Sequence, residues 1–479
     1  MKKCVLFLSV AAMVCLLVSP AWADGSEPDE LQALKNQLME LNKMMQSQQQ
    51  QIQEQGQKIK ELEGAAKEPV PYADVEGIVE KVKADLPKPA DGITVGGGKI
   101  KITPYGFLRL DMAYDDSAVL LGAGNINAWA WPEQGRSPVF REEDDIFSTT
   151  ATATRLGFNF EGPEFSGGTL KGKLEFDFDE SGANDGGGDI TAHRIRLRHA
   201  YGELAYPTWS VLAGQTWDVV APRIPNEIDC IVLWASGNVG YRRPQLRLTK
   251  WWDLDGKKIT AQVSANAADR KAPTAGAASA DDLDNDGILD GTDSGFPVGQ
   301  ARIGLDTVII GERKLGIGLS GAVGREQLDF PARPGDKQDV EIWLVALDGS
   351  VTVIPNLLTV QGEIWTGQDV DVFWGGILQG VEKERDNWEP VEASGGFIHA
   401  MLTPRKDLMF NLGYGLDNVD SEDLELGDRS FNSTIFANGI WTVVPNFDIG
   451  LEFAWHETKW VAQANGDDFR VQTAFIYKF

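Results

Sequence analysis

The sequence predicts an all-β transmembrane barrel of about 16 antiparallel strands, preceded by an N-terminal α-helical coiled coil. Three observations carry this prediction. The spacing of apolar residues changes from seven to two near Lys99, and short turns alternate with long acidic loops from there on. Apolar residues make up 42% of the chain, yet after residue 23 no run approaches the roughly 18 that a membrane-spanning helix needs.

The composition describes an exported and acidic protein. The 479 residues include 71 acidic and 44 basic side chains, a net charge of −27, and removal of a leader that contains Lys2 and Lys3 makes it −29. So large a negative charge excludes nucleic-acid binding as a main activity. Because Cys4 and Cys15 fall in the leader, Cys230 is the single cysteine that remains, which excludes a disulfide scaffold and a cysteine-based zinc site.

Residues 1–23 have the three parts of a secretory signal peptide. Two lysines supply the positive region, Val5 to Val18 form the apolar region, and Ala21-Trp22-Ala23 is a cleavage site of small residues. A retained membrane anchor is the alternative, and the short apolar run argues against it. We expect cleavage after Ala23.

Residues 24–66 are predicted to form the coiled coil. From residue 31 to residue 62 the apolar residues keep a 3-4 spacing, and eight of ten seam positions are apolar over more than four heptads. The seams hold Leu31, Leu38, Met45, Ile52 and Ile59, and Leu34, Leu41, Gln48, Gln55 and Leu62. A lone amphipathic helix is the alternative. Residues 67–98 contain a short amphipathic helix followed by many Pro and Gly, and are predicted to be a linker.

From residue 99 to residue 479 the chain alternates apolar and polar side chains in segments of about ten residues. Between Thr169 and Asp179, for example, Leu170, Leu174 and Phe176 alternate with ionisable residues, so one face of the strand is apolar and the other charged. We predict about sixteen strands, at 105–115, 155–161, 169–179, 192–204, 209–218, 241–249, 258–266, 300–308, 315–323, 339–351, 357–366, 395–402, 408–416, 431–442, 447–457 and 468–479.

The connections between these strands alternate in length. Short turns such as Pro207–Thr208 and Pro404–Lys406 alternate with long acidic loops. The long loops are predicted near 116–146, 180–191, 219–239, 267–297, 324–338, 367–394, 417–430 and 459–467. Outer-membrane barrels have short turns at one end and long loops at the other, whereas a soluble sandwich has no reason for this asymmetry. In a barrel the ionisable faces line a wet lumen and the apolar faces meet lipid.

Five motifs carry a resemblance to a known family: Tyr105-Gly-Phe-Leu-Arg109, Thr154-Arg-Leu-Gly-Phe158, Arg194-Ile-Arg-Leu-Arg-His-Ala-Tyr-Gly202, Ala213-Gly-Gln-Thr-Trp217 and Pro445-Asn-Phe-Asp-Ile-Gly-Leu-Glu452. Their order and spacing are similar to those of the trimeric outer-membrane porins of Gram-negative bacteria, specifically the DcaP-like group. The resemblance implies a homotrimer, a periplasmic coiled coil ahead of a sixteen-stranded barrel, and passive uptake of small, often anionic solutes. Phosphate-selective porins share the layout and stay open as an alternative. The terminal Phe479 resembles an outer-membrane insertion signal.

Strand parity predicts a ladder of arginines in the lumen. Ile195 and Leu197 are expected to face lipid, so that Arg194, Arg196 and Arg198 face the lumen at steps of about 7 Å. Such a ladder offers weak sites between which an anion can pass. The same parity predicts further lumen cations at Arg109, Arg155, Lys171, Lys173, Arg243, Arg247 and Arg302.

Two interpretations of these cations are open. They bind passing anions, or they pair with lumen acids such as Asp111, Glu175 and Asp177 and only stiffen the wall. We favour the first interpretation for the ladder, because no acid alternates with its three arginines.

The loop at 219–239, which follows the fifth strand, is predicted to fold inward and narrow the pore. Arg223, Glu227 and Asp229 would then lie at the constriction. An ordinary external loop or a trimer contact is the alternative.

A calcium site is predicted in the long loop at 267–297. Carboxylates occupy positions 1, 3, 5, 9 and 12 with Gly287 at position 6, which is the spacing of an EF-hand loop. The predicted ligands are Asp282, Asp284, Asp286, the backbone carbonyl of Ile288, Asp290 and Asp293. Position 12 is Asp rather than Glu, and its shorter side chain suggests weaker binding. A solvated acidic loop is the alternative.

No catalytic constellation is found in the sequence. It lacks a Gly-x-Ser-x-Gly motif, and its four histidines do not have the spacing of a zinc site. The predicted function is a porin for small hydrophilic solutes, favouring anions such as organic acids, surrounded by lipid and lipopolysaccharide and without an organic cofactor. A loop-borne enzyme, or a non-conducting barrel that tethers the outer membrane or a calcium-dependent surface layer, is the alternative. In that case the coiled coil would contact peptidoglycan or other periplasmic components.

Overall fold

The computed structural model describes residues 92–95, 99–117, 119, 128–132, 145–180, 194–268, 283–284, 288–330, 335–384 and 387–479. The chain divides into two compact units, Met1–Pro89 and Ala90–Phe479, and every described residue lies in the second. The predicted signal peptide, the predicted coiled coil and most of the predicted linker therefore lie outside the described residues.

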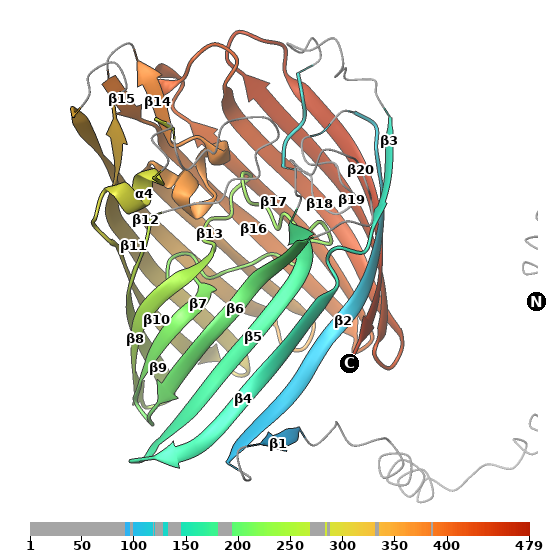
Figure 1. Ribbon diagram of the computed structural model, residues 1–479. Coiled ribbons are helices and arrows are strands. Elements are labelled where there is room, and N and C mark those ends of the chain that lie inside the picture. The colour runs from blue at the N-terminus through green and yellow to red at the C-terminus, as the bar shows by residue number, and fades with distance from the viewer. Residues whose placement is uncertain are drawn as a thin grey trace, which may run out of the picture. The chain divides into compact units, whose positions relative to one another are not determined.

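The second unit is an antiparallel barrel of 16 strands (Figure 1). The wall strands are β2 (Ile100–Asp115), β4 (Arg155–Phe165), β5 (Gly168–Glu180), β6 (Arg194–Ala205), β7 (Trp209–Trp217), β8 (Arg242–Leu254), β9 (Lys257–Asn266), β10 (Val298–Ile310), β11 (Arg313–Asp329), β12 (Lys337–Ile354), β13 (Leu358–Gln368), β16 (Glu392–Arg405), β17 (Leu408–Val419), β18 (Arg429–Val444), β19 (Phe447–Trp460) and β20 (Gly466–Lys478). Two shorter strands, β1 (Ile93–Val95) and β3 (Ile146–Thr150), also pair with β2. Pairing of β20 with β2 closes the wall, which confirms the predicted barrel.

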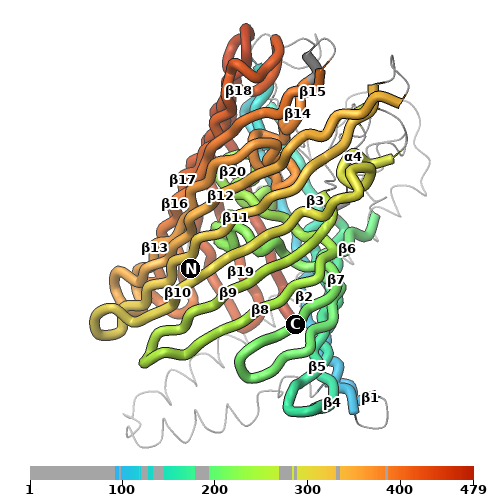
Figure 2. Tube along the Cα trace, turned by 90° about the vertical axis from the view of Figure 1, so that its left-hand side faces the viewer, coloured from blue at the N-terminus to red at the C-terminus, as the bar shows by residue number. Residues whose placement is uncertain are grey.

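Short turns and long loops alternate as the sequence predicted. Turns such as Asp255–Gly256 and Gly311–Glu312 lie at the lower end in Figure 2, and α4, β14 and β15 lie at the upper end. The elements within the long loops are α4 (Asp290–Asp293), η1 (Val370–Phe373), η2 (Gly376–Leu378), β14 (Val381–Glu384), β15 (Asn387–Pro390) and η3 (Ser421–Asp423).

Short strands occur in three segments for which the sequence predicted a loop or a linker. The predicted loop at 116–146 and the residues after it include β3, which pairs with the outer end of β2 through Asp115 and Ile146. The predicted loop at 367–394 contains the hairpin of β14 and β15, and the predicted linker at 67–98 contains β1. Each of these strands is three to five residues long, too short to give a periodic pattern.

Side chains alternate between the two faces of the wall. In β17, Phe410, Leu412 and Tyr414 are 44%, 56% and 40% exposed on the outer face, whereas Asn411 between them is 3% exposed. Apolar residues outside and polar residues inside are what a lipid-embedded barrel requires. Among the described residues, no helix is long and apolar enough to cross a membrane.

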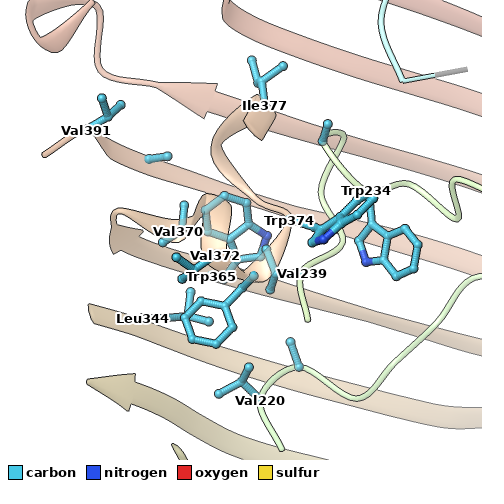
Figure 3. Packing of buried hydrophobic residues seen from close by; sticks show 14 of the residues in the cluster. Val220, Trp234, Val239, Leu344, Trp365, Val370, Val372, Trp374, Ile377 and Val391 are labelled. Carbon is cyan, nitrogen blue, oxygen red and sulfur yellow. The ribbon is translucent and has the colours of Figure 1, made fainter. Parts of the chain in front are cut away.

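The interior of the barrel contains an apolar core made by two loops. Figure 3 shows Trp234 of the β7–β8 loop beside Trp374 of the β13–β16 loop, with ring centroids 4.9 Å apart. Ile377 and Val370 of the second loop belong to the same buried cluster, as does the wall residue Leu344. Both loops therefore fold into the barrel, and their packing reduces the open lumen.

Candidate functional site in the lumen

The β7–β8 connection, residues 218–241, is called the inward loop. It is joined to wall strands far from its own ends. Arg223 Nε lies 2.9 Å from an Asp348 carboxylate oxygen on β12, and Gly237 N donates to Asp417 on β17 at 2.6 Å. Asn432 on β18 donates to the carbonyl of Ala235 at 2.8 Å. These bonds confirm the prediction that this loop folds inward.

Glycines allow the inward loop to approach the wall. At Gly237, φ is +113°, and a Cβ there would lie 2.3 Å from the carbonyl oxygen of Gly396 on β16. A Cβ on Gly415 of β17 would lie 2.0 Å from the carbonyl oxygen of Ser236. Side chains at these positions would separate the loop from the wall, so the contact depends on bare backbone on both sides.

The far side of the inward loop is held by the anchor cluster, which comprises Asp115, Asp229, Glu452 and Arg470. Glu452 accepts hydrogen bonds from the backbone N–H groups of residues 228 and 229 at 2.7 and 2.9 Å. Arg470 lies 2.8 Å from Asp115 and 3.3 Å from Asp229, and the side chains of these three residues are fully buried. Burial raises the pKa of Asp229 on the loop to about 7, against the opposing effect of Arg470. These buried contacts attach the inward loop to β2, β19 and β20.

Strands β4, β5 and β6 carry the cation wall: Arg155, Lys173, Arg196 and Arg198 with Glu175 and Asp177. Arg196 binds Asp177 through two hydrogen bonds of 2.8 and 2.9 Å. Arg198 reaches both acids, at 2.8 Å from Glu175 and 2.7 Å from Asp177. Arg155 and Lys173 lie 3.7 and 3.4 Å from Glu175. Two of the three arginines of the predicted ladder, Arg196 and Arg198, are therefore paired with acids of the neighbouring strand β5, so the pairing that the alternative interpretation requires is present for these two.

The cation wall differs from the anchor cluster in its exposure. The side chains of Arg155, Lys173 and Arg196 are 30%, 27% and 21% exposed, whereas that of Arg198 is 8% exposed. Charged groups that are partly in water keep most of their capacity to interact with a solute.

A β-bulge changes the predicted parity at the top of β6. Pairing with β5 shifts register between Glu175 and Phe176, and Arg198 has no direct partner. As a result Arg198 and His199 are both buried, at 7% and 5% exposure, although they are adjacent in sequence. His199 Nδ1 lies 3.1 Å from the Thr216 hydroxyl of β7. Strict alternation of faces therefore fails at this point, because the bulge adds a residue to one strand.

The other predicted lumen cations occupy different environments. Arg109 pairs with Asp111 at 2.6 Å, Arg243 with Asp218 at 3.0 Å, and Arg302 with Asp348 at 2.8 Å. Arg247 Nε donates to Gln245 at 2.9 Å. Lys171 and Arg194 are exposed. The structure thus brings Arg155, Lys173, Arg196 and Arg198 together and places the others elsewhere along the wall.

The three residues predicted at the constriction have different positions. Asp229 is fully buried in the anchor cluster, and Glu227 accepts a hydrogen bond from Leu233 N within the loop at 2.8 Å. Arg223 pairs with Asp348 and remains partly exposed. Of the three, Arg223 is the one that borders a cavity.

Sequence reasoning did not single out several residues that shape the lumen. The Tyr105 hydroxyl donates to Glu175 at 2.6 Å and so orders the cation wall from β2. Asp348 binds both Arg302 and Arg223. Strand parity would have placed Asp348 in the lumen, because it follows the outward-facing Leu347. Arg242, whose guanidinium lies 4.5 Å from the ring centroid of Trp217, carried no such signal.

The predicted calcium loop is described only in part. Asp282 and Asp286 lie outside the described residues. Asp290 accepts a hydrogen bond from Leu283 N at 3.0 Å, and Asp293 pairs with Lys337 at 2.7 Å. Within the described ranges, no group of three His, Cys, Asp or Glu side chains could hold a metal ion.

Phe479 lies at the seam where the barrel closes. Its backbone exchanges two hydrogen bonds with Gly106 of β2, at 3.0 and 3.1 Å, and its side chain is 51% exposed. The terminal aromatic residue is therefore on the outer surface beside the first wall strand.

Comparison with known proteins agrees with this architecture. The structure matches the outer-membrane channel DcaP of Acinetobacter baumannii with a TM-score of 0.61 and 20% sequence identity, over 81% of this chain and 99% of that chain. An anion-selective porin from Comamonas acidovorans aligns at 12% identity over 80% of this chain and all of that chain, with a TM-score of 0.48. No family model and no curated protein matches the sequence. The match to DcaP shows the fold of this chain, which is that of a porin-like 16-stranded outer-membrane barrel.

Proposed function

We propose that the protein is an outer-membrane porin for passive diffusion of small hydrophilic solutes, and that its pore favours anions such as organic acids. The observation that carries the proposal is the cation wall on β4, β5 and β6. Four cations and two carboxylates form it, and three of the cations are 21% to 30% exposed.

The arrangement of the inward loop determines which part of the wall a solute meets. Its backbone and side chains are bonded to β10 through Gln300, to β12 through Asp348, and to β19 and β20 through Glu452 and Arg470. Arg109 on β2 also donates to the carbonyl of Ile228. The cation wall lies on β4, β5 and β6, outside this series of attachments. A solute that passes beside the loop therefore meets the cation wall.

The cation wall contains more cations than carboxylates, so it favours anions in spite of its ion pairs. Glu175 and Asp177 are each shared by more than one cation, so neither carboxylate neutralises its partners fully. A partly hydrated anion can then exchange between neighbouring cations at small cost, which is the condition for conduction rather than tight binding. The acidic charge of the whole chain does not oppose this preference, because distant charges are screened by salt within about 10 Å at 0.1 M.

The direct test is the reversal potential of the purified protein in a planar bilayer with a KCl gradient. We expect an anion-selective potential in the parent. Arg196→Gln and Lys173→Gln should each move it toward zero, because each removes one exposed cation. Arg405→Gln is the matched control, since Arg405 is 59% exposed and pairs with Asp407 in a turn. Cation selectivity in the parent, or equal potentials in all four proteins, would overturn the proposal.

Cys230 provides an independent measurement of the local potential. It lies on the inward loop, where its thiolate form would be attracted electrostatically by Arg109 and Arg155. An anionic thiosulfonate reagent should therefore react with Cys230 faster than a cationic reagent of equal size. The difference should shrink in Lys173→Gln and persist in Arg405→Gln. A faster reaction with the cationic reagent would contradict an electropositive passage.

The class of anion that the pore prefers can be identified by comparing the currents that different anions carry. Organic acids and inorganic phosphate both bind arginine through charge-assisted hydrogen bonds. We propose organic acids, so acetate or succinate should carry more current than phosphate at equal charge and concentration. Absence of any conductance would instead support the non-conducting structural barrel.

We further propose that the protein is a homotrimer whose coiled coil, residues 24–66, lies in the periplasm and can contact peptidoglycan. Eight apolar residues at ten seam positions support self-association. Light scattering of the purified protein should give three times the mass of the mature chain. Deletion of residues 24–66 should lower the stability of the trimer and leave the conductance of an assembled pore unchanged.

The terminal Phe479 is proposed to act as the insertion signal. Its position at the closing seam, with an exposed ring, supports recognition before closure. Phe479→Ser should reduce the amount of protein in the outer membrane, whereas the same change at Phe410, which is also exposed on the outer face, should reduce it less.

Calcium in the loop at 282–293 is a separate proposal, supported by the spacing of its carboxylates. Lys337 pairs with Asp293 and therefore competes with calcium for that carboxylate. Isothermal titration should detect one calcium site in the parent, none in the double variant Asp284→Ala, Asp286→Ala, and tighter binding in Lys337→Gln. Equal calcium binding by the parent and the double variant would show that this loop is not a calcium site.

A further inference from the structure

A cavity of about 490 Å³ opens inside the barrel near the short turns, and we call it the Arg223 chamber. Its charged lining comes from three sources: Arg223 on the inward loop, Asp253, Lys257 and Lys258 at the β8–β9 hairpin, and Asp306 and Lys314 at the β10–β11 hairpin. Because short turns are the periplasmic side of an outer-membrane barrel, the chamber lies between the inward loop and the periplasm. Its volume is in the range of sites for small ligands.

Most of the charged side chains that line the chamber make no ion pair within the described part of the chain, whereas Arg223 is bound to Asp348. Asp253, Asp306, Lys258 and Lys314 make no ion pair within 4.0 Å among the residues that the structure describes, although both signs line one cavity. Asp306 is exposed to solvent, and its carboxylate has no ion-pair partner among the described residues. This differs from the cation wall, where each carboxylate is bound to arginine. Exposed charges without a protein partner are accessible to a solute that enters the cavity.

Arg223 and Asp306 converge on the same point of the cavity wall. A Cβ built on Gly316 of β11 would lie 2.7 Å from an Asp306 carboxylate oxygen and 3.1 Å from an Arg223 guanidinium nitrogen. Both groups therefore occupy the space above Gly316 that a side chain would fill. Arg223 is held there by Asp348, which also binds Arg302 at 2.8 Å. In the chamber, the hydrogen-bond donor Arg223 is held in place beside the acceptor Asp306, which has no ion-pair partner in the ranges that the structure describes. The hydroxyl groups of Ser350 and Thr352 also line the chamber.

We propose that the Arg223 chamber binds small solutes that carry both a carboxylate and an ammonium group, as α-amino acids do. The carboxylate contacts Arg223 and Lys314, and the ammonium contacts Asp306. This inference rests on the proposed pore function and deepens it, because it names a solute class within the anions and zwitterions that the pore admits. A diacid without an amine satisfies only the cations and leaves Asp306 facing a like charge.

The experiment compares glutamate with glutarate, which have the same two carboxylates and differ in the ammonium group. Binding to the purified full-length protein in detergent is measured by isothermal titration, and permeation by liposome swelling. The parent should bind glutamate roughly two- to fivefold more tightly than glutarate, as expected for one solvent-exposed charge contact. Asp306→Asn should remove the difference, because it weakens glutamate binding and relieves the repulsion of glutarate. Lys314→Gln should weaken both.

Asp255→Asn is the matched control, since Asp255 lies in the adjacent β8–β9 turn and outside the chamber lining. It should leave both affinities unchanged. Equal binding of glutamate and glutarate by the parent, or equal effects of Asp306→Asn on the two, would overturn the proposal. The two proposals fail separately: anion-selective reversal potentials with no preference for glutamate retain the pore and reject the chamber, whereas absence of conductance with glutamate bound in titration rejects the pore alone.

Discussion

The anchor cluster and the cation wall are built from the same kinds of residue and differ in what surrounds them. In the anchor cluster, Arg470, Asp115 and Asp229 are fully buried, and they hold the inward loop against β20 and β2. In the cation wall, Arg196 and its neighbours on β4 and β5 are 21% to 30% exposed beside the passage. Burial makes an unpaired charge very costly and exposure makes it cheap. The comparison shows that arginine–carboxylate pairs serve as structural attachments in one place and as a solute surface in another.

The largest effect that would test this comparison is expected from Arg470→Gln. The change leaves Asp115 and Asp229 buried without their cation, and breaking a buried pair in this way costs about 3–5 kcal/mol. The same change at Arg196 should cost about 1 kcal/mol or less, because Asp177 keeps Arg198 at 2.7 Å. Thermal unfolding of the two variants in detergent measures the difference. Equal losses of unfolding free energy in the two variants would show that the anchor cluster and the cation wall contribute equally to stability.

An intermediate effect is expected from Gly237→Ala. The added Cβ would lie 2.3 Å from the Gly396 carbonyl oxygen in a backbone conformation with φ of +113°. We expect a loss of about 1–3 kcal/mol, together with a larger conductance, because the inward loop must move away from β16. Gly256→Ala, with φ of +78° and nothing within 4 Å of the added Cβ, is the control for backbone strain alone. If both variants keep the parent conductance, the loop does not limit the passage.

The smallest effect is expected from pH. The pKa of Asp229 is raised from 3.8 to about 7 in the folded protein, so the folded state binds a proton more tightly than the unfolded chain between these values. Stability should therefore fall as the pH rises from about 4 to about 7 and change little from this group at higher pH. Asp229→Asn should reduce that slope, whereas Asp407→Asn in the exposed β16–β17 turn should not. Unfolding temperatures of the parent and the variants, measured from pH 4 to pH 8, test this prediction. If the unfolding temperature of Asp229→Asn depends on pH as steeply as that of the parent, the inward loop is not attached through a protonated Asp229 carboxyl.

The wall of the barrel was predictable because its signals are local. Alternation of apolar and polar residues gave the sixteen strands, and the lengths of the connections gave the two ends. Local parity also assigned lumen faces correctly where pairing is regular, as for Arg109 and Arg302. Alternation placed Arg198 on the lumen side, where it contacts Glu175 and Asp177, but it failed at His199, because a bulge is a property of a strand pair and has no sequence period.

The interior of the barrel was less predictable because its contacts join distant parts of the chain. The partners of Arg196 and Arg198 lie on β5, so the absence of an acid within β6 did not imply an absence of pairing. Arg470 and Asp229 are 241 positions apart in sequence, by their numbers, and nothing local relates them. The predicted inward loop was correct in direction, but which of its side chains faces the wall depends on these distant contacts.

The closing seam has a consequence for the order of assembly. Gly106 near the start of the barrel bonds to Phe479, the last residue, and the inward loop is attached to β18, β19 and β20. Contacts between such distant segments form slowly, because a long stretch of chain must be ordered first. Neither the wall nor the loop can reach its final position until the C-terminal strands have been exported. The shape of the passage is therefore set by the part of the protein that arrives last, and a chain that stops one strand early would have both an open seam and an unattached loop.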